Sequence, residues 1–190
     1  YKQGDIDLGV KQGDIVIDGG GCWGDTALYF ASKNAKAVYS FEFTKENLQI
    51  FHNNLAGNAL NSQVISIIES ALWNEDDITL NFKNAGPATS VVLNRALEET
   101  VVAITIDTFV EREHIERIDF IKMDIEGAEL KALEGARRTI ERFAPHLAIT
   151  VYHKQEDLCT IPQYLKSLRP DYEFFLDHFT TTMIETVLFA

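Results

Sequence analysis

The sequence is short of cysteines, of basic residues and of long apolar runs, and each shortage excludes a class of protein. Its two cysteines, Cys22 and Cys159, are too few and too far apart for a disulfide framework or a zinc site. We therefore expect a reducing, cytoplasmic setting. No apolar run reaches membrane-spanning length, and no segment has the pattern of a signal peptide. Because the chain starts at Tyr1, inside a polar stretch, we expect it to be part of a longer protein.

The 17 basic residues are outnumbered by 29 acidic ones, which gives a formal net charge of −12. We expect no nucleic-acid partner, because binding to polyphosphate usually requires a basic face. The acidity is interpreted as favouring solubility, and a small neutral or basic substrate is compatible with it. With 190 residues, 46% of them hydrophobic and 24% charged, the chain is predicted to form one globular domain over residues 1–190.

Short apolar runs predict strands, and apolar residues at helical spacing predict helices between them. The predicted strands cover residues 14–18, 37–42, 64–68, 118–124, 147–152, 172–176 and 186–189. One helix is expected to begin at Thr44, one to be capped by Asp107, and one to have Pro162 in its first turn. A single helix is expected over residues 130–140. These repeated strand–helix units indicate an α/β fold, with a mainly parallel sheet covered by helices on both faces.

One stretch departs from this alternation of strands and helices. Residues 77–82 and 90–93 alternate in polarity on either side of the turn residues 84–87. This pattern predicts an antiparallel β-hairpin inserted in the α/β fold. Residues 101–105 are expected to form another short extended piece.

The first predicted strand runs into the segment Asp18–Asp25, which reads DGGGCWGD. Its glycines predict a tight turn that lets backbone N–H groups approach a ligand, with the next helix directing its positive end at an anionic group. Gly19, Gly21 and Gly24 satisfy the dinucleotide pattern GxGxxG, which alone would suggest NAD or FAD. Asp18 favours a different ligand, because a carboxylate repels pyrophosphate but suits the ammonium group of a methionine moiety, directly or through water.

Three further residues are expected around the nucleoside part of that ligand. Glu42 ends the second strand, where an acid can accept hydrogen bonds from both ribose hydroxyls, in NAD-binding and S-adenosylmethionine-binding folds alike. Phe43 is a candidate to cover the adenine, with a place in the core as the alternative. Ala71 follows the third strand and is interpreted as a backbone contact to the adenine.

With these segments in view, the chain resembles the FkbM family of methyltransferases over nearly its whole length. The resemblance rests on residues 17–26, 41–42, 70–72, 105–107 and 118–129. The last segment, IDFIKMDIEGAE, is the most specific, whereas the glycine loop alone indicates only class I methyltransferases. The family's loop pattern is matched by Asp18, Gly20 and Gly24, and Cys22 replaces its middle glycine.

The resemblance implies a Rossmann-like class I fold, a seven-stranded sheet with an antiparallel last strand, and S-adenosylmethionine as cofactor. It also implies O-methylation of a small molecule, typically at a hydroxyl of a sugar or natural product, without specifying the acceptor. The residues expected to bind the cofactor are Asp18, Gly19, Gly20, Cys22, Gly24, Asp25, Glu42, Phe43 and Ala71.

Candidates for catalysis cluster after the fourth strand. Lys122 and Asp124 share one face of that strand, and Asp124 lies at its carboxyl end, where parallel α/β sheets bind their ligands. Asp124 is therefore a candidate base that deprotonates the acceptor hydroxyl, with Lys122 orienting the carboxylate or the acceptor. His153 ends the fifth strand at the same edge and is a second candidate base near neutral pH.

Three further candidates are expected on the substrate side. Glu126 enters the first turn of a helix, where an acid either complements the helix dipole or contacts the substrate. His178 and Glu185, from the region of the last two strands, are weaker candidates. No ligand spacing demands a metal, so none is expected, although Asp124, His153 and a third acid are the residues that would assemble one.

Two other classes of function stay open at this point. The pattern formed by Gly19, Gly21 and Gly24, together with Glu42, also fits an NAD-dependent oxidoreductase. A noncatalytic nucleoside-binding domain would share the same loop. Binding of NADH instead of S-adenosylhomocysteine would select the oxidoreductase.

Overall fold

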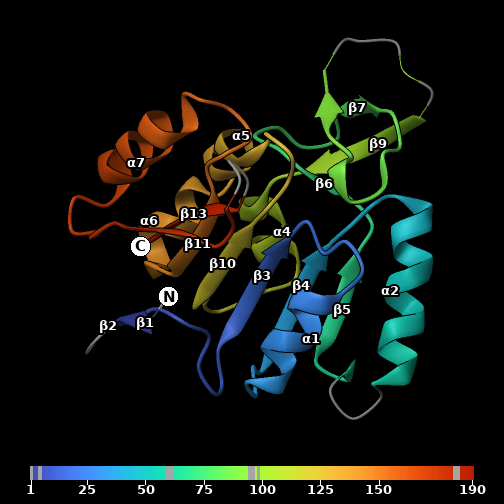
Figure 1. Ribbon diagram of the computed structural model, residues 1–190, viewed down its shortest axis with the longest axis horizontal. Coiled ribbons are helices and arrows are strands. Elements are labelled where there is room, and N and C mark those ends of the chain that lie inside the picture. The colour runs from blue at the N-terminus through green and yellow to red at the C-terminus, as the bar shows by residue number, and fades with distance from the viewer. Residues whose placement is uncertain (1, 4–5, 59–61, 94–96, 98, 182–184) are drawn as a thin grey trace.

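A computed structural model describes residues 2–3, 6–58, 62–93, 97, 99–181 and 185–190 (Figure 1). Its centre is a seven-stranded sheet in the order β12-β13-β11-β10-β3-β4-β5. These strands are β3 (Ile15–Gly19), β4 (Ala37–Phe41), β5 (Ile65–Ile68), β10 (Phe120–Met123), β11 (His146–Thr150), β12 (Phe175–His178) and β13 (Thr186–Phe189). β13 runs antiparallel to β11 and β12, and the neighbouring pairs from β11 to β5 are parallel. The predicted sheet with its antiparallel last strand is confirmed.

Helices cover both faces of this sheet. They are α1 (Asp25–Ser32), α2 (Lys45–Gly57), α4 (Ile106–Arg112), α5 (Glu129–Glu134), α6 (Arg137–Phe143) and α7 (Asp157–Leu168). Successive side chains of a strand point to opposite faces, so Ile15 and Ile17 pack in a cluster with α4 to α7, whereas Val16 packs with α1 and α2. Burial on both faces explains why the strands read as continuous apolar runs.

The predicted hairpin is confirmed and belongs to a larger insertion. β7 (Thr79–Phe82) pairs antiparallel with β8 (Val91–Val92), on either side of a 3₁₀ turn at Gly86–Ala88. β9 (Glu99–Ile104) and β6 (Ala71–Leu72) extend the pair into a four-stranded sheet in the order β6-β9-β7-β8. This small sheet lies beyond the carboxyl ends of β4 and β5, at the edge where the site forms (Figure 1).

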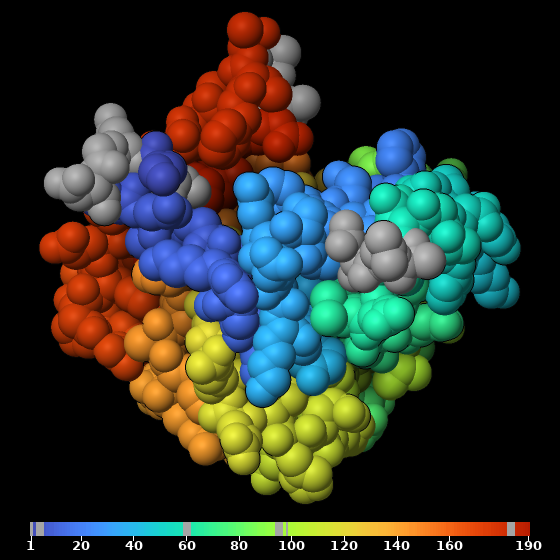
Figure 2. Space-filling view, turned by 90° about the horizontal axis from the view of Figure 1, so that it is seen from below, coloured from blue at the N-terminus to red at the C-terminus, as the bar shows by residue number. Residues whose placement is uncertain are grey.

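The two ends of the chain lie close together. A short antiparallel pair, β1 (Lys2–Gln3) and β2 (Ile6–Asp7), precedes Leu8 and Val10, which pack against a cluster that includes residues of the C-terminal strands. In the space-filling view the blue N-terminal residues adjoin the red C-terminal ones (Figure 2). No helix in the described part of the chain is long and apolar enough to cross a membrane.

The prediction of a single helix over residues 130–140 is wrong, because α5 and α6 are separate helices that meet at Gly135. A Cβ on Gly135 would come 2.1 Å from the carbonyl oxygen of Trp73, and the Gly135 carbonyl accepts a hydrogen bond from Asp107 N (2.9 Å). Contacts with distant segments therefore break the helix. Pro162 also lies in the middle of α7 and not in its first turn, because that helix begins at Asp157.

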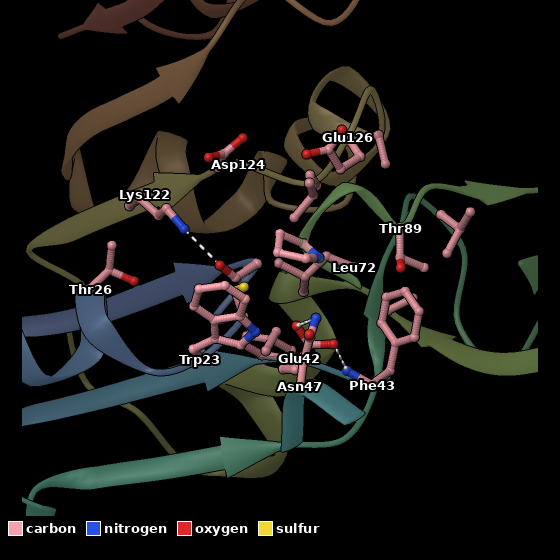
Figure 3. Close-up of a pocket in the computed structure, with 18 of the residues that line it drawn as sticks. Trp23, Thr26, Glu42, Phe43, Asn47, Leu72, Thr89, Lys122, Asp124 and Glu126 are labelled. Carbon is pink, nitrogen blue, oxygen red and sulfur yellow. Dashed lines mark hydrogen bonds between the residues drawn. The ribbon is translucent and has the colours of Figure 1, made fainter. Parts of the chain in front are cut away.

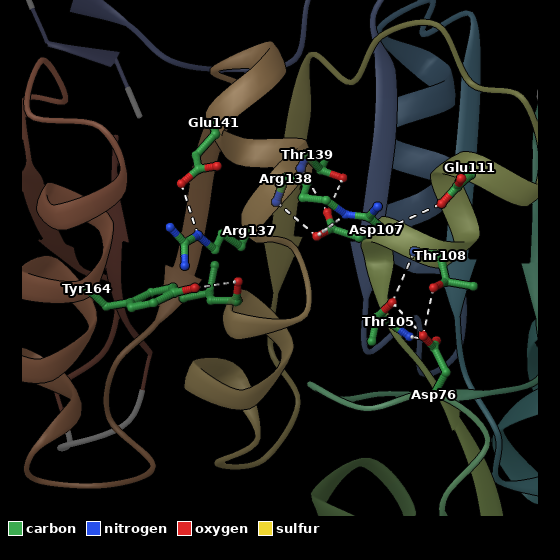
Figure 4. A network of polar contacts seen from close by, with 11 residues as sticks. Asp76, Thr105, Asp107, Thr108, Glu111, Arg137, Arg138, Thr139, Glu141 and Tyr164 are labelled. Atoms are coloured by element: carbon green, nitrogen blue, oxygen red, sulfur yellow. Dashed lines mark hydrogen bonds and ion pairs between the residues drawn. The ribbon is translucent and has the colours of Figure 1, made fainter.

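The predicted cap of α4 is corrected as well. Thr105 is the N-cap, and its hydroxyl accepts a hydrogen bond from Thr108 N (3.0 Å). The Asp107 carboxylate instead accepts hydrogen bonds from Arg138 N (2.9 Å) and Thr139 N (2.8 Å), so it caps the neighbouring helix α6 (Figure 4). Sequence spacing pointed to a cap but did not reveal which helix it serves.

Asp76 ties the segment after β6 to the start of α4. Its carboxylate accepts hydrogen bonds from Thr105 N (2.7 Å) and from the Thr108 hydroxyl (2.7 Å) (Figure 4). Partial burial alone would raise the pKa of Asp76, but these hydrogen bonds outweigh it and hold the pKa below its ordinary value.

Asp76→Asn is expected to lower the free energy of unfolding at neutral pH by about 1–3 kcal/mol, because hydrogen bonds to a charged group are lost. Since the folded-state pKa of Asp76 lies below the unfolded one, the stability is fully present above the unfolded pKa, about 3.9. It disappears as the pH falls through the folded-state pKa. Urea unfolding of the wild-type protein and Asp76→Asn, from neutral to acidic pH, should show the difference in their free energies of unfolding shrink as the pH falls. A difference that does not change with pH would contradict the prediction.

Candidate active site

A cavity of about 330 Å³ opens at the carboxyl edge of the sheet, between the loop after β3, the end of β4, the end of β10 and the small sheet (Figure 3). Most of the predicted site residues line it, namely Gly20, Cys22, Asp25, Glu42, Phe43, Ala71, Lys122, Asp124 and Glu126. Sequence reasoning missed other lining residues, among them Trp23, Thr26, Asn47, Thr89 and Tyr152. These lie on loops and helix faces whose orientation has no periodic signal. Their role in the site follows from tertiary structure alone.

Asp18 lies behind the cavity and does not line it. Its side chain is fully buried in β3 and accepts hydrogen bonds from the hydroxyls of Ser40 (2.7 Å) and Thr26 (3.1 Å). Lys122 Nζ pairs with its carboxylate at 3.2 Å. The Asp18 carboxylate, predicted to meet the ammonium group of the ligand, is thus bound to residues of β4, α1 and β10.

Lys122 holds the glycine loop in place. Its Nζ donates hydrogen bonds to the carbonyl oxygens of Gly19 (3.1 Å) and Gly20 (2.8 Å). Burial alone would lower the pKa of Lys122, but the carboxylates of Asp18 and Asp124 raise it above its ordinary value. The charged ammonium is therefore a positioning group for the loop.

The glycines of the loop pack closely against neighbouring protein atoms. An added Cβ would come 1.9 Å from the carbonyl oxygen of Asp124 at Gly20 and 2.1 Å from the Phe51 ring at Gly24. Both glycines have positive φ, 77° and 82°. Gly19 belongs to β3, and Gly19 and Gly24 are not among the residues lining the cavity. The tight packing of the loop shapes the cavity floor.

Cys22 lies in this loop with its side chain on the cavity. Its φ is 46°, a left-handed conformation that is uncommon outside glycine. Burial, together with the nearby Glu42 carboxylate, raises the pKa of the Cys22 thiol to about 11. The thiol is therefore protonated at neutral pH and is a weak nucleophile.

Glu42 lies on the opposite side of the cavity from Asp124 and Glu126 (Figure 3). One carboxylate oxygen accepts hydrogen bonds from Phe43 N (2.6 Å) and from Thr44, through N (2.8 Å) and the hydroxyl (3.1 Å). The other accepts one hydrogen bond, from Asn47 Nδ2 (3.1 Å), and keeps capacity for further donors. Thr44 is the N-cap residue of α2 as predicted, but its hydroxyl donates to Glu42 and makes no capping hydrogen bond to the helix.

Phe43 and Ala71 line the cavity next to Glu42. The Phe43 ring packs edge-on against Phe82, with centroids 4.9 Å apart, and joins the small cluster under the four-stranded sheet. Phe43 therefore packs against a core aromatic and also lines the cavity.

An acidic cluster forms at the end of β10. Asp124 and Glu126 line the cavity, and His153 adjoins them from the segment after β11. His153 Nδ1 lies 2.9 Å from Glu129 Oε1, and its Nε2 lies 3.3 Å from Glu126 Oε2. Burial raises the pKa of Asp124, against the attraction of Lys122 and His153.

The surroundings of His153 argue against its predicted role as a neutral base. Burial alone would lower the pKa of His153, but the carboxylates of Glu126 and Glu129 raise it to about 10. As long as no cation lies between these carboxylates, the imidazole therefore carries its second proton at neutral pH and accepts no other. His178 lies apart, beside a separate hollow, with its Nδ1 2.8 Å from the Thr186 hydroxyl.

Known proteins share the fold and part of the sequence of this chain. Residues 7–176 match the family model described as the methyltransferase FkbM domain. The chain is similar to a crystal structure of an FkbM methyltransferase from Methylobacillus flagellatus, with 28% identity and a TM-score of 0.74 over 93% of this chain and 43% of that one. It thus spans less than half the length of that protein. No curated protein matches.

Two more distant structures share the fold. An rRNA methylase from Streptococcus thermophilus has 16% identity and a TM-score of 0.60, over 96% of this chain and 88% of that one. A putative methyltransferase from Streptococcus mutans, in complex with SAH, has 15% identity and a TM-score of 0.57, over 95% and 89%. Both share the arrangement of the sheet and its helices.

Proposed function

Because the chain belongs to the FkbM family of methyltransferase domains, which use S-adenosylmethionine, we propose that it transfers this cofactor's methyl group to a hydroxyl oxygen of a sugar or natural product. The observation that carries the proposal is one cavity with a fixed carboxylate, Glu42, on one side and the acidic residues Asp124 and Glu126 on the other (Figure 3). The Glu42 side suits a nucleoside, and the side with Asp124 and Glu126 suits an acceptor hydroxyl.

The residues present fit the cofactor. Four hydrogen bonds hold the Glu42 carboxylate at the cavity wall, and its less occupied oxygen is free to accept from ribose hydroxyls. Ala71 and Phe43 give an apolar wall beside it for the adenine. With Asp18 buried, Asp25 is the loop carboxylate that faces the cavity, and it is where we place the ammonium group of the methionine end.

When bound, S-adenosylmethionine supplies a methyl carbon that the acceptor oxygen attacks, while the carbon–sulfur bond pair returns to sulfur and the hydroxyl proton leaves. The chain contributes orientation, for which well-placed reactants gain roughly 7–11 kcal/mol. Asp124 accepts the hydrogen bond of the acceptor hydroxyl and takes up its proton, a step worth about 10²–10⁴-fold in rate. Lys122 keeps the loop against β10, so both reactants meet at the same edge.

A small-molecule acceptor is favoured over RNA by the charge of the chain. Its formal net charge is −12, and the wall proposed for the acceptor is itself acidic. Phosphates would be repelled from such a wall, whereas neutral hydroxyls would form hydrogen bonds with it.

Calorimetric titration with S-adenosylhomocysteine and with NADH, side by side, tests the cofactor. We expect S-adenosylhomocysteine to bind and NADH not to bind. Binding of NADH without binding of S-adenosylhomocysteine would favour an NAD-dependent oxidoreductase instead. Transfer of a labelled methyl group to a panel of sugars, lipid-linked sugars and polyketides then tests the reaction. If the cofactor binds and no member of the panel is labelled, the noncatalytic binding domain becomes the better description.

A further inference from the structure

One buried ring nitrogen of His153 makes no hydrogen bond to any residue that the structure describes. The side chain is 9% exposed, and this nitrogen, Nε2, has only carboxylates at ion-pair distance. This atom faces Glu126 Oε2 at 3.3 Å and Asp124 Oδ1 at 3.6 Å, on the wall of the cavity. An unsatisfied buried polar atom costs about 1–3 kcal/mol, so the space between these three groups is suited to an occupant that satisfies all of them.

The other nitrogen of His153 is held in the way that metal-binding histidines are held. Its Nδ1 lies 2.9 Å from Oε1 of Glu129, whose side chain is fully buried. The same oxygen accepts hydrogen bonds from Ile125 N (3.0 Å) and the Thr150 hydroxyl (3.1 Å), which fixes the carboxylate. A carboxylate on one nitrogen orients the ring and leaves the lone pair of the other for a metal ion.

We propose that Asp124, Glu126 and His153 bind one divalent cation, of which Mn²⁺ is the best match, at the acceptor side of the cavity. Their ligand atoms all lie within 4.8 Å of one another. In octahedral coordination with bonds of about 2.1 Å, adjacent ligands lie about 3 Å apart, close to the separations that the side chains already have. One imidazole and two carboxylates suit Mn²⁺, because carboxylates select hard ions and imidazole the softer ones.

This inference rests on the proposed methyl transfer for its catalytic meaning and names the acceptor class. Three protein ligands leave about three of six positions open towards the cavity. Two adjacent oxygens of a vicinal diol, as in a sugar, would occupy two of them. The cation lowers the pKa of the bound hydroxyl, and because Asp124 is then a ligand of the cation, the proton passes to solvent water. The oxygen's electron pair forms the bond to the methyl carbon, and the electron pair of the broken carbon–sulfur bond stays on sulfur. The cation keeps its oxidation state throughout.

The test titrates Mn²⁺ into the chelator-stripped protein, with neither cofactor nor acceptor present. Binding is measured as the loss of the electron paramagnetic resonance signal of free Mn²⁺. We expect one Mn²⁺ per chain. Asp124→Asn and Glu126→Gln should each weaken binding at least tenfold. Both side chains are partly exposed, 31% and 26%, so these variants are expected to fold. Glu185→Gln is the matched control, because Glu185 lines the same cavity outside the cluster and its loss should leave Mn²⁺ binding unchanged.

The outcomes separate this inference from the proposed function. No Mn²⁺ binding, or equal binding by all variants, overturns the inference and leaves a proton as the occupant of the cluster. Methylation of a diol at the same rate by the stripped and the Mn²⁺-loaded protein also overturns it, while the methyl transfer stands. If Mn²⁺ binding is weakened in Asp124→Asn and Glu126→Gln but no acceptor is methylated, the metal site is supported and the proposed function is contradicted.

Discussion

Gly20→Ala is expected to lower the free energy of unfolding by about 2–5 kcal/mol, the largest effect on stability of any change considered. The new Cβ would come 1.9 Å from the carbonyl oxygen of Asp124, a backbone atom that cannot rotate away. Overpacking of this kind costs about 1–3 kcal/mol. The φ of 77° adds about 1–2 kcal/mol, because an alanine is strained in the left-handed region.

Two other glycines separate the two causes. Gly13 has a φ of 87° and no described atom within 4 Å of an added Cβ, so Gly13→Ala should show the backbone cost alone. Gly57 has no positive φ, and no described atom outside its own helix lies within 4 Å of an added Cβ, so Gly57→Ala should leave stability unchanged or slightly raised. Urea unfolding of the three variants measures the differences. If Gly20→Ala costs no more than Gly13→Ala, the loop does not depend on its close approach to β10.

Glu42→Ala is expected to weaken binding of S-adenosylhomocysteine by about 10²–10⁴-fold, the largest effect on ligand binding. Two hydrogen bonds from the ribose hydroxyls to a charged group would be lost, at about 1.5–3 kcal/mol each. Each 1.4 kcal/mol corresponds to a factor of ten in affinity. Calorimetric titration of the wild-type protein and the variant measures the ratio.

A paired ligand distinguishes contact with ribose from a loss of local structure. Wild-type protein should bind adenosine more tightly than 2′,3′-dideoxyadenosine, whereas Glu42→Ala should bind the two equally. Asn47→Ala is the matched control, since it removes one of the four hydrogen bonds that hold the carboxylate and leaves the carboxylate itself. It should cost less than about tenfold. If Glu42→Ala weakens the binding of 2′,3′-dideoxyadenosine as much as the binding of adenosine, the role of Glu42 is to hold the start of α2.

The strands, the insertion and the cavity-lining residues at strand ends were predictable from sequence because their signals are local. Strands buried on both faces are continuous apolar runs, and a hairpin shows alternation around turn residues. Residues at strand ends share one edge of a parallel sheet, so Glu42 and Asp124 were expected in one site. The string at residues 118–129 carried the family resemblance that the family model then matched.

Two of the errors have a common origin, because each depended on a partner far away in the chain. The break at Gly135 comes from the carbonyl of Trp73, and Asp107 caps α6 because that helix packs beside α4. Neither partner is visible in a local pattern. Pro162 was misplaced for a simpler reason, since the start of α7 has no side-chain cap to mark it.

By itself the sequence determined that strands and helices alternate, that a glycine loop follows the first strand, and that acidic residues follow the second and fourth strands. Only the tertiary structure decided what those groups do. It buried Asp18 against Ser40, Thr26 and Lys122, and it turned one nitrogen of His153 to Glu129 and the other to two carboxylates. The physical reason is that the charge and hydrogen bonding of a buried group are set by neighbours that packing brings together.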